Sequence, residues 1–292
     1  MRIGLNIDGL YEISTLIKKC RIIEKTGFDT IWLGEGPEHR HIYPVLATAA
    51  SKTEKITIGT SILSVHMHKP FQLFQAFKLL KDVFGNRFII GIGRGGEKHL
   101  ASIGKNSFKT ISLLEEYLRI YNNSKLDLPI YLGAIGFKTL IKLGDKFNGV
   151  IINSISPKII KTIMEKTKLK NNNILAIGPA AYRPSKKTWN KFLMACAFIA
   201  SELPDRIALE FEINTQIQEV RSYFFKHNII ELNRIAAFLI ENFGIAGSIE
   251  DFEKRVSELE KIGVKEVIFS HPISEEARKF NEFTKKIDRL RI

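Results

Sequence analysis

Eight short apolar runs, separated by helical patterns, constrain the fold more than any other feature of this sequence. The runs are Ile3–Ile7, Thr30–Leu33, Ile56–Leu63, Phe88–Gly91, Ile130–Leu132, Val150–Asn153, Ile174–Ile177 and Val267–Ser270. They are rich in Ile and Val and show little polar–apolar alternation, which is typical of parallel strands covered on both faces. Eight strands alternating with helices predict an α/β fold, a closed (β/α)8 TIM barrel. The alternative is an open doubly wound sheet.

The helical patterns complete each β/α unit. They cover Ile13–Thr26, Tyr43–Lys52, Phe71–Phe84, Thr110–Tyr121, Phe137–Phe147, Pro157–Lys168, Ile249–Ile262 and Glu275–Leu290. Between Pro184 and about Gly247 the rhythm breaks, and three helices without a strand are predicted: Thr188–Glu202, Ile207–His227 and Glu231–Phe243. This stretch is too apolar for disorder. We interpret residues 184–247 as a helical insertion after the seventh strand of one domain spanning residues 1–292, which covers a mouth of the barrel or forms a subunit interface.

Composition limits the classes of partner. Apolar residues make up 45% of the chain and charged residues 26%, as in ordinary globular proteins, and no apolar run is long enough to span a bilayer. The chain begins like a strand, so we expect a cytoplasmic protein without a membrane partner. The net charge is +13, but the lysines are scattered over nearly every helix and no nucleic-acid-binding motif is present. The positive field is therefore expected to attract an anionic cofactor or substrate rather than nucleic acid.

Metal and thiol chemistry are not expected. Cys20 and Cys196 have no Cys or His at the spacing of a metal site, and both fit the buried side of a helix. The pair His39 and His41 lacks an evident third ligand. No metal site is predicted.

The segment Arg87–Gly96 carries the strongest local signal, because an apolar run ends there in four glycines. Gly91, Gly93 and Gly96 match the G-x-G-x-x-G pattern of dinucleotide folds. That pattern requires a following strand closed by an acid about twenty residues later, and here the next strand begins only at Ile130, with no acid at its end. The glycines therefore fit better as the mouth of a barrel's fourth strand, where backbone approaches a ligand closely.

Other strand ends also carry polar or small residues. The segment Gly34–His41 holds two acids, two histidines and an arginine, and fits either a solvated loop or a cofactor or substrate contact. Ala134–Gly136 and Asn153–Ser154 each precede a helix, so they fit either a phosphate seat or close strand–helix packing. His66, His68 and His271 are interpreted most simply as loop or structural residues.

Taken together, these junctions resemble the bacterial luciferase-like superfamily, and within it the F420-dependent methylenetetrahydromethanopterin reductases. The resemblance covers nearly the whole chain. Its most specific part is Gly85-Asn86-Arg87 running into Gly91-Ile92-Gly93-Arg94-Gly95. The supporting segments are Gly27–Trp32, Arg40–Tyr43, Ile58–Thr60, Pro129–Ala134, Gly149–Asn153, and Gly247 before the helix that carries Phe252.

The resemblance implies a homodimer or higher homo-oligomer that binds coenzyme F420, or alternatively FMN, at the carboxyl end of the barrel. It implies a bulge with a non-proline cis peptide at Ser61–Ile62 behind the ring. The loop of Gly93, Arg94 and Gly95 would approach the ring, with Glu35 as an acid near it. The ribityl and phosphate end would lie against Ala134, Ile135, Gly136, Asn153 and Ser154.

The activity implied is hydride transfer between the deazaflavin and a small organic substrate, with 5,10-methylenetetrahydromethanopterin or a related pterin one-carbon carrier as the first candidate. Two positions depart from the reductases: Asn6 stands where they carry a Glu, and Gly96 where they carry an Asp. Proton handling would then pass to Glu35, Glu38 or Glu97. The alternatives are an FMN-dependent luciferase-like monooxygenase and a degenerate, non-catalytic barrel.

Overall fold

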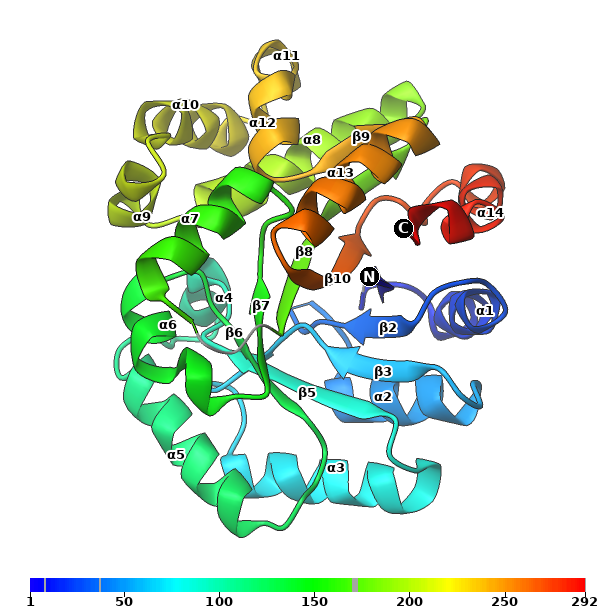
Figure 1. Cartoon of the computed structure of the whole chain (residues 1–292), viewed down its shortest axis with the longest axis vertical. Helices are drawn as coiled ribbons and strands as arrows, with labels where there is room; N and C mark the ends of the chain where they lie inside the picture. The colour runs from blue at the N-terminus through cyan, green and yellow to red at the C-terminus, as the bar shows by residue number, and fades with distance from the viewer. Residues whose placement is uncertain (8, 37, 170–172, 292) are drawn as a thin grey trace.

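The barrel predicted from the sequence is present and closed. The computed structural model describes residues 1–7, 9–36, 38–169 and 173–291. Its parallel strands follow the order β10-β1-β2-β3-β5-β6-β7-β8, and β10 also pairs with β8, which closes the ring (Figure 1). Their bounds are β1 Arg2–Ile7, β2 Thr30–Leu33, β3 Thr57–Thr60, β5 Phe88–Gly93, β6 Ile130–Gly133, β7 Gly149–Ile152, β8 Ile174–Tyr182 and β10 Val264–Ser270. The open doubly wound alternative is therefore wrong.

Two predicted strand boundaries need correction. The run predicted as one strand over Ile56–Leu63 is split into β3 and the short β4 (Leu63–Ser64), and the Ser61–Ile62 peptide between them is cis. The region predicted to lack strands ends in β9 (Ile245–Gly247), which pairs with the extended end of β8. A three-residue strand gives too short a pattern to be recognised in the sequence.

Helices form the outer layer, as predicted, with some ends shortened. Their bounds are α1 Ile13–Glu24, α2 Ile42–Ser51, α3 Pro70–Phe84, α5 Thr110–Asn123, α6 Phe137–Leu143, α7 Pro157–Thr167, α13 Ile249–Lys261 and α14 Ala277–Thr284. Short 3₁₀ turns at Gly144–Lys146 and Ile287–Leu290 replace the predicted ends of α6 and α14. A further helix, α4 (Glu97–Ser102), follows the glycine loop and was not predicted.

The insertion lies between β8 and β9, on one side of the barrel (Figure 1). It contains α8 Lys186–Ser201, α9 Asp205–Glu210, α10 Asn214–Phe225, α11 Ile229–Arg234 and α12 Ala236–Asn242. The second and third helices predicted for it are each divided, into α9 with α10 and α11 with α12. Glu212 adopts a φ of 60° between α9 and α10, a conformation that does not continue an α-helix. No helix in the described ranges combines the length and apolarity required to cross a membrane.

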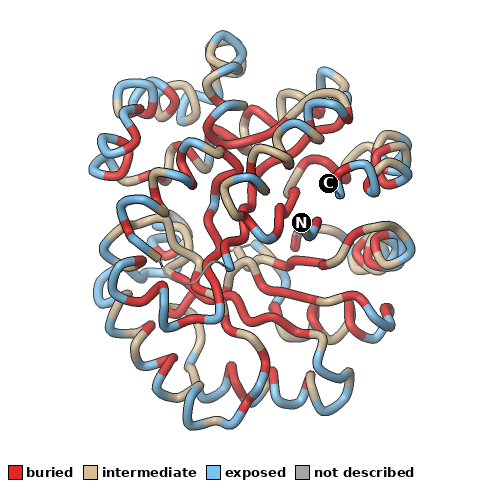
Figure 2. Tube along the Cα trace, viewed as in Figure 1, coloured by how far each residue is buried: buried red, intermediate tan, exposed pale blue. Residues whose placement is uncertain are grey.

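The core has two clusters of buried side chains, and buried residues are frequent along the central strands (Figure 2). One large cluster fills the space between strands and helices. A second cluster fills the barrel interior and contains Trp32, Ile89, Ile151, Leu175, Ile177 and Ile268. The indole of Trp32 is fully buried. A Cβ on Gly4 or Gly59 would lie within 3.0 Å of it, so these glycines make room for the ring.

A carboxylate lies beside Trp32 in the barrel interior. Glu266 is 1% exposed, and its Oε1 accepts hydrogen bonds from Trp32 Nε1 at 2.7 Å and from the Thr30 hydroxyl. Arg2 Nε lies 3.5 Å from its Oε2. Burial raises the pKa of Glu266, while Arg2 and the two donors act in the opposite direction.

The hydroxyl of Thr60 joins β3 to β5 where β3 ends. Thr60 Oγ1 donates to Gly91 O at 2.9 Å and accepts from Gly91 N at 2.8 Å. A Cβ on Gly91 would lie closer than 3.0 Å to Thr60 O, which is backbone and cannot rotate away. This close approach explains a glycine in the middle of a buried strand.

Gly91→Ala is expected to destabilise the protein by about 3 kcal/mol, because the added methyl group forces two backbones apart. Gly136→Ala is the matched control, since a Cβ there meets nothing within 4 Å and its φ is negative. Urea unfolding of both variants checks this. Equal stabilities of the two variants would contradict the close approach at Gly91.

Glu266 is expected to make stability fall as pH rises above 4.5, the ordinary pKa of its carboxyl group. Between that value and its raised pKa the folded state keeps a proton that the unfolded chain releases. In Glu266→Gln this part of the pH dependence should disappear, whereas the exposed Glu219→Gln should keep it. The measurement is the free energy of unfolding in urea between pH 4.5 and 8. Parallel pH profiles for all three proteins would refute the assignment.

Candidate active site at the barrel mouth

The break in the third strand places Ile62 across the carboxyl end of the barrel. The Ser61–Ile62 bond is cis, which confirms the expectation from the resemblance. The half-buried Ile62 side chain lies over the inner cluster and fits between two glycines. A Cβ on Gly133 would lie 2.5 Å from Ile62 Cγ2, and one on Gly93 would lie 2.9 Å from Ile62 Cδ1. The glycines at these two strand ends therefore leave room for the Ile62 side chain, which we call the seat of Ile62. Ile62 gives the mouth of the barrel an aliphatic surface.

Asn6 ties the first strand to this bulge. Its Nδ2 donates to Ser61 Oγ at 2.7 Å and to Trp32 O at 3.3 Å. An ionised carboxylate at this position could not donate to the Trp32 carbonyl. Asn6 therefore fixes the bulge with N–H groups, and its amide has no acidic proton to release.

Glu35 is held in a chain of polar side chains. Its Oε2 lies 2.7 Å from His68 Nε2, and His68 Nδ1 lies 3.0 Å from the Tyr43 hydroxyl. Its Oε1 accepts from the backbone N–H of Ser64. The side chains of Glu35 and His68 are only 7% and 9% exposed. Burial, and next the charge of Glu35, raise the pKa of Tyr43, so this phenol stays protonated.

The role of His68 was missed in the sequence, where it was interpreted as a loop residue. Its backbone carbonyl also accepts from Tyr117 at 2.6 Å, so both ends of the residue are fixed. The signal available was an acid directly after the second strand and a histidine after the third, since such positions meet at one end of a barrel.

The glycine loop after β5 is fastened to β4. Ser64 Oγ donates to Arg94 O, and Val65 N donates to Gly93 O at 2.9 Å. Gly95 has a φ of +86°, and a Cβ there would lie 3.1 Å from the Ser64 side chain. The Arg94 side chain is 32% exposed and lies 3.6 Å from Glu97. This loop thus presents backbone and one guanidinium group at the rim.

The two junctions expected to hold a phosphate differ in exposure. Ala134, Ile135 and Gly136 are half-buried, and the space beside Gly136 is open. Asn153 is exposed, whereas Ser154 is fully buried. The Ser154 hydroxyl donates to Asn242 O at 3.1 Å, at the end of α12, and accepts from Ser156 N. In this arrangement the Ser154 side chain connects the barrel to the insertion.

His99 on α4 is a second residue that sequence reasoning missed. Its Nε2 is buried and, within the described ranges, has no hydrogen-bond partner. Burial lowers the pKa of His99, the charge of Glu35 opposes that effect, and His39 adds to it. Glu35 and His39 are therefore its electrostatic neighbours. The helix that carries His99 is too short to leave a clear pattern in the sequence.

The site therefore combines an aliphatic support with a polar rim that includes imidazole and carboxylate groups. Such a surface suits a flat ring with polar edges. No group of three or more His, Cys, Asp or Glu side chains in the described part of the chain is arranged to hold a metal ion. Both cysteines are buried, and burial raises the pKa of Cys20 to about 12.

Several known proteins are similar to this chain in sequence. Residues 8–125 match the family model described as luciferase-like monooxygenase. A 5,10-methylenetetrahydromethanopterin reductase of Archaeoglobus fulgidus is 24% identical over 92% of both chains.

Solved structures show the same fold. The coenzyme F420-dependent tetrahydromethanopterin reductase of Methanopyrus kandleri superposes with a TM-score of 0.84 over 97% of both chains, at 18% identity. An F420-dependent secondary alcohol dehydrogenase, in complex with an F420–acetone adduct, gives a TM-score of 0.70 over 100% of this chain and 99% of its own, at 13% identity.

Glu35→Ala is expected to destabilise the protein by about 3 kcal/mol, because it leaves the buried His68 ring and the Ser64 N–H without their acceptor. Glu38→Ala, an exposed acid three residues later, should change stability by less than about 0.5 kcal/mol. Chemical denaturation of the two variants provides the measurement. Similar losses in both would mean that Glu35 is not held as described.

Proposed function

We propose that this chain, whose residues 8–125 match the family model described as luciferase-like monooxygenase, is an F420-dependent oxidoreductase. It would transfer a hydride between the deazaflavin and a small organic substrate, with 5,10-methylenetetrahydromethanopterin or a related pterin one-carbon carrier as the first candidate. The full-length similarity to a reductase with that name supports the substrate class. Homo-oligomeric assembly and a cytoplasmic location remain predictions from the sequence.

The observation that carries this proposal is the seat of Ile62 between Gly93 and Gly133. It gives an aliphatic support, open toward the mouth, on which one face of a planar ring can rest. The glycine loop lets backbone approach the ring edge, and Asn6 with Ser61 fixes the support from the β1 side. The ribityl and phosphate end would extend toward Ala134–Gly136 and Asn153.

When bound, the deazaflavin supplies the hydride chemistry, and the chain supplies position and electrostatics. Ile62 sets the depth of the ring, and Glu35 orients His68. Both Glu35 oxygens are already engaged, so Glu35 is proposed as a positioning residue. His99 keeps its buried Nε2 uncommitted. We propose His99 as the group that holds or releases a proton, in place of the acids replaced by Asn6 and Gly96.

Titration of the purified protein with oxidised F420, followed by fluorescence, tests the proposal. We expect a micromolar dissociation constant. Ile62→Ala should weaken binding at least tenfold, about 1.4 kcal/mol, because the support under the ring is lost. Ile141→Ala, an aliphatic residue of α6 that is 63% exposed, is the matched control and should bind like the wild type. Absence of binding by the wild type, or equal binding by both variants, would refute the proposal.

The description of the family model favours one alternative, an FMN-dependent luciferase-like monooxygenase. The same titration with FMN distinguishes the two cofactors. Tighter binding of FMN than of F420, followed by oxygen consumption when reduced FMN is supplied, would establish the monooxygenase instead.

A further inference from the structure

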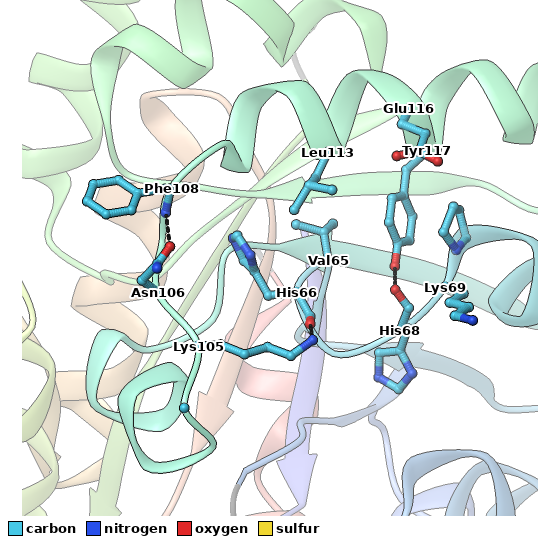
Figure 3. A pocket seen from close by; sticks show the side chains of 12 residues that line it. Val65, His66, His68, Lys69, Lys105, Asn106, Phe108, Leu113, Glu116 and Tyr117 are labelled. Atoms are coloured by element: carbon cyan, nitrogen blue, oxygen red, sulfur yellow. Dashed lines mark hydrogen bonds between the residues drawn. The ribbon is translucent and has the colours of Figure 1, made fainter.

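A cavity of about 510 Å³ lies beside the loop that joins β4 to α3. Three segments line it: residues 65–70 of that loop, the connection from α4 to α5, and the first turns of α5 (Figure 3). Its volume lies within the range of small-molecule sites. The proposed hydride chemistry does not use this cavity.

The charges around the cavity are mainly positive. Lys69 and Lys105 line it, and Glu116 is the acid among its lining residues. Lys105 Nζ donates to the carbonyl of His66, which holds the ammonium group against the wall (Figure 3). Burial, Lys105 and Arg94, in that order, lower the pKa of the His66 imidazole. The contributions of Lys105 and Arg94, which are smaller than that of burial, reflect the positive charge at the wall.

Several donors at the wall remain to be used by a ligand. Lys105 has three N–H groups, of which the His66 carbonyl takes one. Asn106 accepts from Phe108 N through Oδ1 at 3.0 Å, so its amide N–H₂ is left to donate (Figure 3). An oxyanion is the ligand group that such donors and charges favour.

The rest of the lining is apolar. Val65 is buried and Leu113 is half-buried, with Pro70 on the same loop. The Phe108 side chain at the outer edge is 77% exposed, a large apolar surface in contact with water. An apolar ligand body would cover this surface, and the resulting burial would add to the affinity.

The same loop connects the cavity to the barrel mouth. His68 lines the cavity and also contacts Glu35. Val65, on the cavity wall, donates to Gly93 in the glycine loop. A ligand in the cavity therefore rests on the segment that fixes both Glu35 and the glycine loop.

We propose that this cavity is a binding site for a small organic oxyanion, with the anionic group at Lys105 and Asn106 and the apolar body against Val65, Leu113 and Phe108. The site is separate from the ring seat of Ile62, and the proposal does not rest on the function proposed above.

Isothermal titration of the whole chain with phenyl phosphate, benzoate and inorganic phosphate, at constant ionic strength, tests this site. We expect phenyl phosphate or benzoate to bind at least fivefold more tightly than inorganic phosphate, because the ring covers the apolar wall. The tighter of the two identifies a phosphoryl or a carboxylate ligand. Lys105→Gln should weaken that binding at least fivefold. Lys78→Gln removes an exposed lysine of α3 outside the cavity, and should leave the binding unchanged.

The pKa of His66, followed by NMR in a histidine-labelled sample, provides a readout at the site. It should rise when phenyl phosphate or benzoate binds, and the signal is assigned with His66→Asn. Thermal unfolding confirms that each variant is folded. No binding of any probe, equal weakening by the two lysine substitutions, or an unchanged pKa of His66 would overturn the proposal. None of these results depends on F420 binding.

Discussion

The interaction on which the mouth of this barrel depends is the double hydrogen bond between the Thr60 hydroxyl and the backbone of Gly91. It holds β3 against β5 at Thr60, the last residue of β3. The chain then leaves the sheet for two residues and returns as β4, which pairs with β5 beyond Gly91. Ile62 can face the mouth only because this detour is anchored on both sides. A continuous third strand would place Ile62 in a regular ladder instead and would remove the support for a ring.

The barrel and its strand order follow from the sequence, because each rests on a local pattern. The position of the detour does not, since the residue pattern predicts one strand over Ile56–Leu63 and only the family resemblance implies a bulge there. Ile- and Val-rich runs identify the strands, and glycines after the fourth run identify the close approach of backbone. The Gly85-Asn86-Arg87 motif proves to serve the fold, since Arg87 donates to Thr53 at the end of α2. The contact of His68 with Glu35 could not be predicted from the sequence, because it joins residues 33 positions apart and depends on the exact path of a loop. The burial of the His99 ring nitrogen could not be predicted either, because it depends on how side chains pack, and residue spacing does not describe packing.

Asn6 and Ser154 illustrate a second limit of inference from motifs. Both occupy positions at which the resemblance implies a contact with cofactor or substrate, yet the structure gives each a connection within the protein. Asn6 joins two strands to the bulge, and Ser154 joins the barrel to the insertion. The type of residue at a strand end therefore identifies the region of the site. Whether such a residue contacts a ligand or supports a neighbouring residue depends on the partner to which its side chain donates a hydrogen bond.

The indole of Trp32 and the inner cluster close the barrel interior below Ile62. A ring lying on Ile62 would thus have one open face, and the barrel axis offers no second entrance. If two ligands must stack for hydride transfer, both would have to enter through this one opening. The ligand that lies on Ile62 would then keep the other ligand away from the bottom of the site. For the proposed hydride transfer, the kinetic consequence would be a compulsory order of binding. The cofactor would enter first and leave last, and excess substrate that occupied the bottom of the site before it would act as an inhibitor.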